Sequence, residues 1–112
     1  MVNIATTGVD RTPPGGRIAM YSAAKAAVLR YSQSLAVELG PDGVRVNCIS
    51  PGIIESARVK AQAAARNLGT EAQAKANPLC RLGTPEDCAG ALEFLVTGEC
   101  IRVSGGATLV SS

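Results

Sequence analysis

The sequence has no histidine and no tryptophan, and aromatic residues make up only 3% of its 112 residues. Without histidine, the chain cannot form the Ser–His or Cys–His pairs that activate a nucleophile in many hydrolases. None of its four cysteines belongs to a C-x-x-C pair, so no metal site is expected. We expect small thiols, mostly buried, in a reducing compartment at Cys48, Cys80, Cys88 and Cys100.

Charge and hydropathy exclude two further classes of protein. No apolar stretch approaches the roughly 18 residues of a membrane span, and no charged-then-apolar leader is present. The net charge of +2 is small and scattered, which argues against a nucleic-acid partner. Hydrophobic residues at 46% and charged residues at 18% are typical of a globular chain. The composition therefore predicts one soluble, cytoplasmic domain over residues 1–112 with an aliphatic core.

The hydrophobic pattern alternates between strands and helices. An apolar stripe runs along the first predicted helix through Ala24, Val28, Tyr31, Leu35 and Leu39, and Gly40 is expected to end that helix as a left-handed cap. Thr84 is a good N-cap for the last helix, with Pro85 in its first turn. The pattern predicts strands at 1–7, 44–50 and 100–103, and helices at 19–39, 55–67 and 84–96, with one more turn at 70–75.

This order gives a βαβαβ unit with right-handed crossovers. The predicted fold class is α/β, a partial Rossmann-type three-layer fold with a short parallel sheet. Such sheets are normally covered on both faces, and the predicted helices are barely enough for that. We therefore expect one face or one edge of the sheet to be uncovered.

The sharpest chemical signal is Tyr21-Ser22-Ala23-Ala24-Lys25 at the start of the first helix. A spacing of four residues puts the phenol and the ammonium on one face of a helix. A nearby cation favours the phenolate, which suits a tyrosine that transfers protons. An ordinary exposed Tyr/Lys pair is the alternative interpretation, because this spacing is common on helices.

The wider context resembles the short-chain dehydrogenase/reductase family. The matching motifs are Y-S-A-x-K-A-A-V, L-A-x-E-L, G-x-R-V-N and S-P-G within residues 21–52, then R-x-G-x-P-E-D-x-A within 81–89. The closing Ser-Gly-Gly is similar to the D-G-G turn of the family. These motifs cover nearly the whole chain.

The resemblance implies roles for single residues. Tyr21 would be the catalytic acid/base, and Lys25 would hold the nicotinamide ribose and lower the pKa of the tyrosine. The family places a serine at the preceding strand end, where this chain has Thr6 and Thr7. A threonine hydroxyl donates the same hydrogen bond, although its methyl group restricts the rotamer. The two threonines are equally well read as a β-branched pair that closes a strand.

The resemblance also implies a cofactor, NAD or NADP, and a small carbonyl or alcohol substrate. Pro51, Gly52 and Ile54 match the loop that faces the nicotinamide, and Ser56 stands where the family often has a cofactor-touching threonine. Residues 55–83 would form the lid-like substrate segment, which is rich in alanine and identifies no substrate.

The dinucleotide fingerprint of the family is missing. Thr7-Gly8 begins a T-G-x-x-x-G-x-G pattern, but the glycines that would let a backbone approach a pyrophosphate do not follow. Compared with the family, the chain is expected to begin at about the fifth of seven strands. Two further departures are the short connection after Phe94-Leu95 and Ser104 in place of an aspartate.

Three interpretations remain open at this point. The chain is a truncated catalytic half of an oxidoreductase, with little or no turnover alone. Alternatively, it is a non-catalytic interaction module that forms a homo-oligomer or pairs with an intact subunit of the family. The third interpretation is a gene fragment or internal-start product without a selected role.

Overall fold

The computed structural model describes residues 1–9, 18–66, 69–95 and 100–103. Its centre is a parallel sheet with the strand order β1-β2-β3, formed by β1 (Val2–Ile4), β2 (Asn47–Pro51) and β3 (Cys100–Val103). Val2 pairs with Asn47, and Cys48 pairs with Cys100. The third strand has the predicted bounds, whereas the first is shorter than the predicted 1–7 and the second begins three residues later than predicted.

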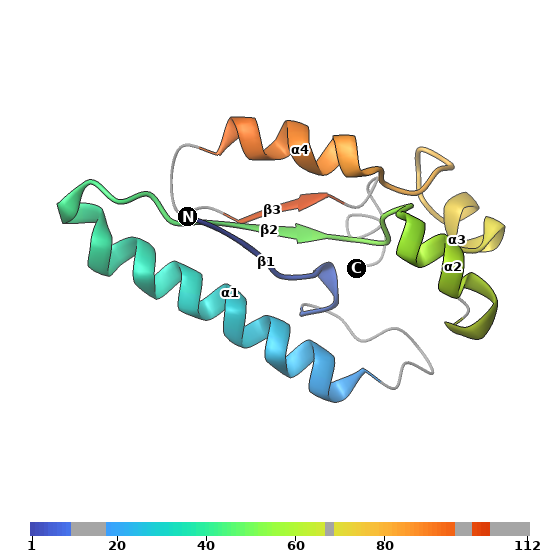
Figure 1. Cartoon of the computed structure of the whole chain (residues 1–112), viewed down its shortest axis with the longest axis horizontal. Coiled ribbons are helices and arrows are strands. Elements are labelled where there is room, and N and C mark those ends of the chain that lie inside the picture. Colours follow the sequence, from blue (N-terminus) through green and yellow to red (C-terminus); the bar gives the residue numbers. More distant parts are fainter. Residues whose placement is uncertain (10–17, 67–68, 96–99, 104–112) are drawn as a thin grey trace.

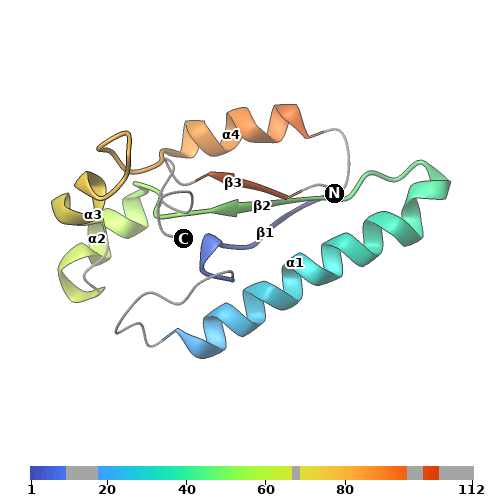
Figure 2. The same cartoon turned by 180° about the vertical axis from the view of Figure 1, so that it is seen from behind.

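The sheet lies between two helices, α1 (Ala19–Leu39) on one face and α4 (Pro85–Phe94) on the other (Figures 1 and 2). This arrangement confirms the α/β class and the parallel sheet. Among the described elements, the middle strand is the most buried, because both helices and both neighbouring strands cover it. Val46 and Ile49 are each 1% exposed, and Cys48 and Ser50 are also buried.

Helix α1 has the predicted bounds, but its end differs from the prediction. Gly40 keeps a right-handed conformation with φ −55°, so its assignment as a left-handed cap is wrong. One turn of 3-10 helix, η2 (Gly40–Asp42), follows instead, because Pro41 fits the first turn of a helix. Gly43 then takes the left-handed conformation with φ 75° and donates its N–H to the Gly40 carbonyl at 2.9 Å.

The face of α1 that packs on the sheet is more polar than the predicted stripe. Ala24 and Tyr31 are exposed, whereas Ser32 is 2% exposed. The Asn3 amide Nδ2 donates to Ser32 Oγ at 2.8 Å, and Ser32 Oγ donates to the Val28 carbonyl at 2.7 Å. The sequence predicts a continuous apolar contact between this helix and the sheet. The buried residue at its centre is instead the hydrogen-bonded Ser32.

Between β2 and α4 the chain forms two short helices, α2 (Ala57–Arg66) and α3 (Glu71–Lys75). Helix α3 begins with a capping box in which Thr70 Oγ1 accepts from the Gln73 N–H at 3.2 Å. Helix α4 begins with the predicted Thr84 cap. The predicted end of α4 near Val96 lies outside the described residues, but Leu95 already has an extended conformation.

Strand β1 forms an open edge of the sheet. It pairs only with β2 in the described part of the chain, and the side chains of Val2 and Ile4 are 44% and 54% exposed. Within the described residues, this agrees with the expectation of an uncovered edge. No helix among the described residues has both the length and the apolar character needed to cross a membrane.

The sequence predicts mostly buried cysteines, and the structure agrees only in part. Cys48 is buried and Cys88 is half-buried, but Cys80 is exposed, because it lies in the surface turn after α3. None of these three is in a disulfide bond. The side chain of Cys100 lies outside the described part. Across the residues that the structure describes, no group of histidine, cysteine or carboxylate side chains is arranged to hold a metal ion.

Candidate functional site

The carboxyl ends of β1 and β2 meet at one edge of the sheet, which is where open α/β sheets bind their ligands. Thr6 follows β1, and its hydroxyl donates to the carbonyl of Pro51, the last residue of β2, at 3.4 Å. The Gly8 N–H donates to the same Thr6 oxygen at 3.4 Å. Thr7 instead begins the 3-10 helix η1 (Thr7–Val9). Of the two predicted hydroxyl donors, Thr6 is the one that the strand ends hold.

Helix α1 brings Tyr21 and Lys25 to the same region. Its first turns run beside the carboxyl end of β1 (Figure 1). Lys25 Nζ donates to the Ile4 carbonyl at 2.7 Å, and this contact fixes the ammonium at the end of β1. Tyr21 lies one helical turn earlier and is 52% exposed. No described residue hydrogen-bonds the Tyr21 hydroxyl, which leaves it able to bind a ligand.

The loop after β2 is held by the segment that precedes α4. Ile54 forms a parallel bridge with Gly83, and the Glu55 N–H donates to the Gly83 carbonyl at 2.7 Å. A Cβ atom at Gly83 would lie 2.6 Å from Ile54 Cδ1, so any larger residue there would require the Ile54 side chain to move. Pro51, Gly52 and Ile54 are all half-buried. Their backbone therefore lies at the site edge, and their contact with a nicotinamide stays a prediction.

Ser56 has a structural role that the sequence comparison with the family did not indicate. Its hydroxyl oxygen accepts from the Val59 N–H at 3.3 Å and so caps the start of α2. The hydroxyl hydrogen is not used by that cap. Ser56 can still donate to a ligand, and its predicted cofactor contact remains a prediction.

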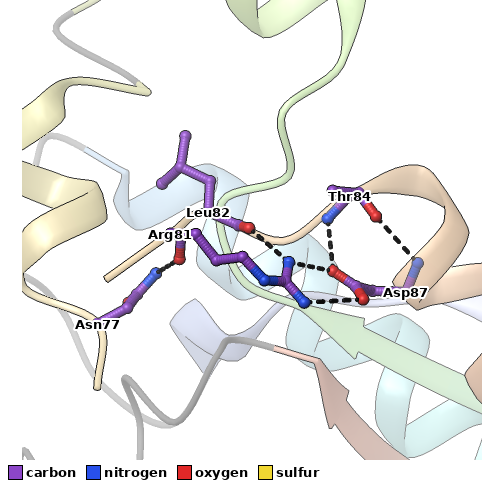
Figure 3. A network of polar contacts seen from close by, with 5 residues as sticks. All are labelled: Asn77, Arg81, Leu82, Thr84 and Asp87. Atoms are coloured by element: carbon purple, nitrogen blue, oxygen red, sulfur yellow. Dashed lines mark hydrogen bonds and ion pairs between the residues drawn. The ribbon is translucent and has the colours of Figure 1, made fainter. Parts of the chain in front are cut away.

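A network of polar contacts fixes the far end of the lid-like segment (Figure 3). Arg81 makes two hydrogen bonds to the Asp87 carboxylate at 2.6 and 3.1 Å and a third to the Leu82 carbonyl at 2.9 Å. Asp87 also accepts from the Thr84 N–H at 2.9 Å, and Asn77 donates to the Arg81 carbonyl at 2.7 Å. The sequence predicts the Thr84 cap but not the arginine that pairs with Asp87.

This network shifts the acidity of both charged partners. The Arg81 hydrogen bonds hold the pKa of the Asp87 carboxyl well below its usual range, and the Thr84 backbone contributes in the same direction. Asp87 raises the pKa of Arg81 in turn. The Arg81 side chain is half exposed and the Asp87 side chain is about a third exposed, so water partly screens the pair. The network therefore fixes the geometry of the loop before α4 and contributes modestly to stability while Asp87 is charged.

The residues at the strand ends suit one end of a nicotinamide dinucleotide better than the other. A tyrosine hydroxyl, a lysine ammonium and a threonine hydroxyl can all bind the polar ribose and a substrate oxygen. The glycine-rich turn that would receive a pyrophosphate is absent from the sequence. The donor set therefore fits the nicotinamide end of such a cofactor and leaves the adenine end without a matching motif.

Comparisons with known proteins match nearly the whole chain to one family. The model of the enoyl-(acyl carrier protein) reductase family matches residues 1–111. A cyclohexanol dehydrogenase from Rhodococcus sp. (strain TK6) is 44% identical over 115 residues, which cover 96% of this chain and 42% of that enzyme.

Solved structures show the same fold. A short-chain type dehydrogenase/reductase from Mycobacterium ulcerans is 36% identical with a TM-score of 0.80, and the match covers 96% of this chain and 41% of that chain. The structure of ElxO with NADP bound is 25% identical with a TM-score of 0.79, over 96% of this chain and 46% of that chain.

The chain thus spans less than half the length of these relatives and corresponds to their carboxyl-terminal portion. The match of a family model over nearly every residue, together with a parallel sheet shared with solved members, identifies the family. This chain belongs to the short-chain dehydrogenase/reductase family.

Proposed function

We propose that this chain carries the nicotinamide side and the proton-transfer side of an NAD(P)-dependent oxidoreductase site that acts on an alcohol or a carbonyl compound. Membership of the family supports the reaction class. The observation that carries the proposal is the meeting of the Thr6 hydroxyl, the Pro51 carbonyl and the Lys25 ammonium at the ends of β1 and β2.

The side chains of Tyr21, Lys25 and Thr6 each have a proposed role that suits their chemistry. The Tyr21 hydroxyl accepts the proton of a substrate hydroxyl, or donates a proton to a substrate carbonyl oxygen in the reverse direction. The Lys25 ammonium lies one turn away on the same helix face, where it can bind the ribose of a cofactor. The Thr6 hydroxyl turns from its long 3.4 Å bond to the Pro51 carbonyl, donates its one hydrogen to the substrate oxygen and orients that oxygen toward Tyr21.

A bound NAD(P) would supply the hydride acceptor or donor, and its nicotinamide end would contact the loop from Pro51 to Ile54. Ser56, with its free hydroxyl hydrogen, would be the next donor along this loop. ElxO, a relative at 25% identity, has been solved with NADP bound, which supports a dinucleotide of this class.

The chain by itself is expected to turn over little or no substrate. It spans 42% of the Rhodococcus enzyme, and it has no motif for the pyrophosphate and adenine. Much of the affinity for a dinucleotide comes from contacts remote from the reacting carbon, and these contacts position the nicotinamide. Activity is therefore expected only when an adenine-binding portion is supplied.

A fusion tests this proposal. The part of the Rhodococcus cyclohexanol dehydrogenase that precedes the matched residues is joined to this chain, and oxidation of cyclohexanol is followed by the absorbance of the reduced cofactor. The Thr6→Ser fusion is expected to keep activity within about threefold, because the donor is retained. The Thr6→Val fusion should lose about 100-fold, the usual size of one lost transition-state donor.

Thr7→Val is the matched control, since Thr7 begins η1 and makes no contact with Pro51 that the structure shows. It is expected to keep most of the activity. Equal losses at Thr6 and Thr7, or no activity in a fusion that folds and binds NADPH, would contradict the proposed roles.

A specific observation favours a second function, association without catalysis. Besides the open edge of β1, helix α1 exposes large apolar side chains, including Met20 at 88% and Val37 at 78%. Apolar surface of this kind promotes association with another protein. A homo-oligomer of this chain, or a complex with an intact family member, that forms without cofactor and shows no turnover in the fusion would favour this second function.

A further inference from the structure

Two cysteines are neighbours in the sheet although they lie far apart in the sequence. Strands β2 and β3 run parallel, and Cys48 of β2 is the register partner of Cys100 of β3. Neighbouring parallel strands hold such partners about 4.8 Å apart and on the same face of the sheet. Disulfides join residues whose Cα atoms lie roughly 4.4–6.8 Å apart, so the backbone at this position suits a disulfide.

The face that these two positions share is the one that α1 covers. Asn3 is the β1 partner of Cys48, and its amide donates to Ser32 of α1, so this row of the sheet faces that helix. Cys48 is 2% exposed and lies beneath this cover. The other two cysteines do not belong to the row, because Cys88 lies in α4 on the opposite face and Cys80 lies in an exposed turn (Figure 1).

The burial of Cys48 determines which oxidation product this place can accept. Its thiol donates a weak hydrogen bond to the Ile49 carbonyl at 3.9 Å, as a neutral thiol does. Oxidation to a sulfinic or sulfonic acid would put an ionised group into a buried place, which is costly. A disulfide is uncharged, so burial favours it over the higher oxidation states.

We propose that Cys48 and Cys100 form a modification site, a thiol pair that hydrogen peroxide converts into a reversible disulfide between β2 and β3. The peroxide oxidises one sulfur to a sulfenic acid and releases one water molecule. The second thiol then attacks that sulfur, the S–S bond forms and a second water molecule leaves. Each thiol loses one hydrogen atom, and the peroxide is reduced to water. The site does not depend on the proposed oxidoreductase reaction.

The bond would tie the last described strand to the centre of the sheet. In the described part of the chain, β3 pairs only with β2. A bond between Cys48 and Cys100 closes a loop of about 50 residues, which restricts the unfolded chain more than the folded one. The Tm of the oxidised chain is therefore expected to lie at least about 5 °C above that of the reduced chain. Dithiothreitol should restore the lower Tm.

Peptide mapping of the full chain tests the pair directly. The reduced, folded chain is treated with hydrogen peroxide, catalase removes the excess, iodoacetamide blocks the remaining thiols in denaturant, and trypsin and a glutamyl endopeptidase cleave the chain. Glu93 and Glu99 lie between Cys88 and Cys100, so this cleavage separates those two cysteines. The peptides of Cys48 and Cys100 should be joined with a loss of about 2 Da, at least about tenfold more often than any pair that contains Cys88.

Matched serine variants assign the effect to the pair. Both carry Cys80→Ser, which prevents disulfides between chains through the exposed thiol. In this background, Cys100→Ser should lose the joined peptide and the rise in Tm, whereas Cys88→Ser should keep both. Circular dichroism checks that each variant folds. The peptide map of the unsubstituted chain gives the answer without them if a variant does not fold.

Three results would overturn the inference. The first is a folded, peroxide-treated chain without the joined Cys48–Cys100 peptide. The second is the same yield of that peptide from the folded chain and from the chain unfolded in urea, since the register would then have no part in its formation. The third is oxidation of Cys48 to a sulfinic acid while Cys100 remains a thiol.

Discussion

The hydrogen bond between Asn3 and Ser32 fixes the helix that carries Tyr21 and Lys25 onto the first strand, and replacing Ser32 by alanine tests this directly. Ser32 Oγ is buried and makes two hydrogen bonds, one from Asn3 at 2.8 Å and one to the Val28 carbonyl at 2.7 Å. Because Ser32 and Lys25 are two helical turns apart, they lie on the same face of α1 and contact consecutive residues of β1.

The expected cost follows from these contacts. Losing one buried hydrogen bond and leaving the Asn3 amide without its partner costs about 1.5 kcal/mol. Alanine is the better helix former and offsets about 0.5 kcal/mol of that loss. Ser32→Ala should therefore lower the free energy of unfolding by about 1 kcal/mol, which corresponds to about 4–8 °C in Tm for a domain near this size.

The assay is thermal and urea unfolding followed by circular dichroism at the helix band. Ser34→Ala is the matched control, since Ser34 lies on the same helix with an exposed side chain. It should leave the Tm unchanged or raise it slightly. If both alanine variants unfold at the same temperature, the Asn3–Ser32 contact does not hold α1 on the sheet, and the reasoning about the placement of Lys25 fails with it.

Two further predictions concern the lid-like segment and the thiols. Asp87→Asn should lower the Tm at pH 7, and the difference from the wild type should shrink as the pH falls below 3.8, the ordinary pKa of this carboxyl, because a depressed pKa stabilises the fold only while the group is charged. A difference that stays constant between pH 7 and pH 3 would contradict the Arg81 contact. With iodoacetamide and peptide mapping, exposed Cys80 should react first and buried Cys48 only on unfolding. Cys88 should react slowly, since burial raises the pKa of its thiol. Equal rates for Cys48 and Cys80 in the folded chain would contradict the fold described.

Local signals explain what could be predicted from the sequence. The bounds of α1 and β3 and the Thr84 cap follow from periodicity and from capping residues close in the chain, so neighbours along the sequence determine them. Tyr21 and the pair Thr6-Thr7 could be identified as candidates from motif spacing, but the difference between the two threonines appears only in the contact of Thr6 with Pro51.

What could not be predicted depends on packing between distant residues. The apolar stripe indicated Tyr31 rather than Ser32 on the sheet side, because the buried Ser32 is satisfied by Asn3 from another element. In the same way, the contact of Lys25 with Ile4 depends on which strand forms the edge of the sheet. Strand order is a tertiary property that no local spacing determines. The left-handed residue is Gly43 and not the predicted Gly40, because one more helical turn follows α1 before the chain reverses.

The most direct test of the central claim compares the two tyrosines of α1. In the fusion with the amino-terminal portion of the Rhodococcus enzyme, Tyr21→Phe and Tyr31→Phe each remove one hydroxyl from an exposed ring on the same helix. If Tyr21 transfers the substrate proton, Tyr21→Phe should lower kcat/KM for cyclohexanol by about 100-fold or more, the usual contribution of a general acid/base. Tyr31→Phe should leave kcat/KM within about twofold. Comparable rates for both variants would contradict the assignment of Tyr21, and with it the proposal that this chain holds the proton-transfer half of the site.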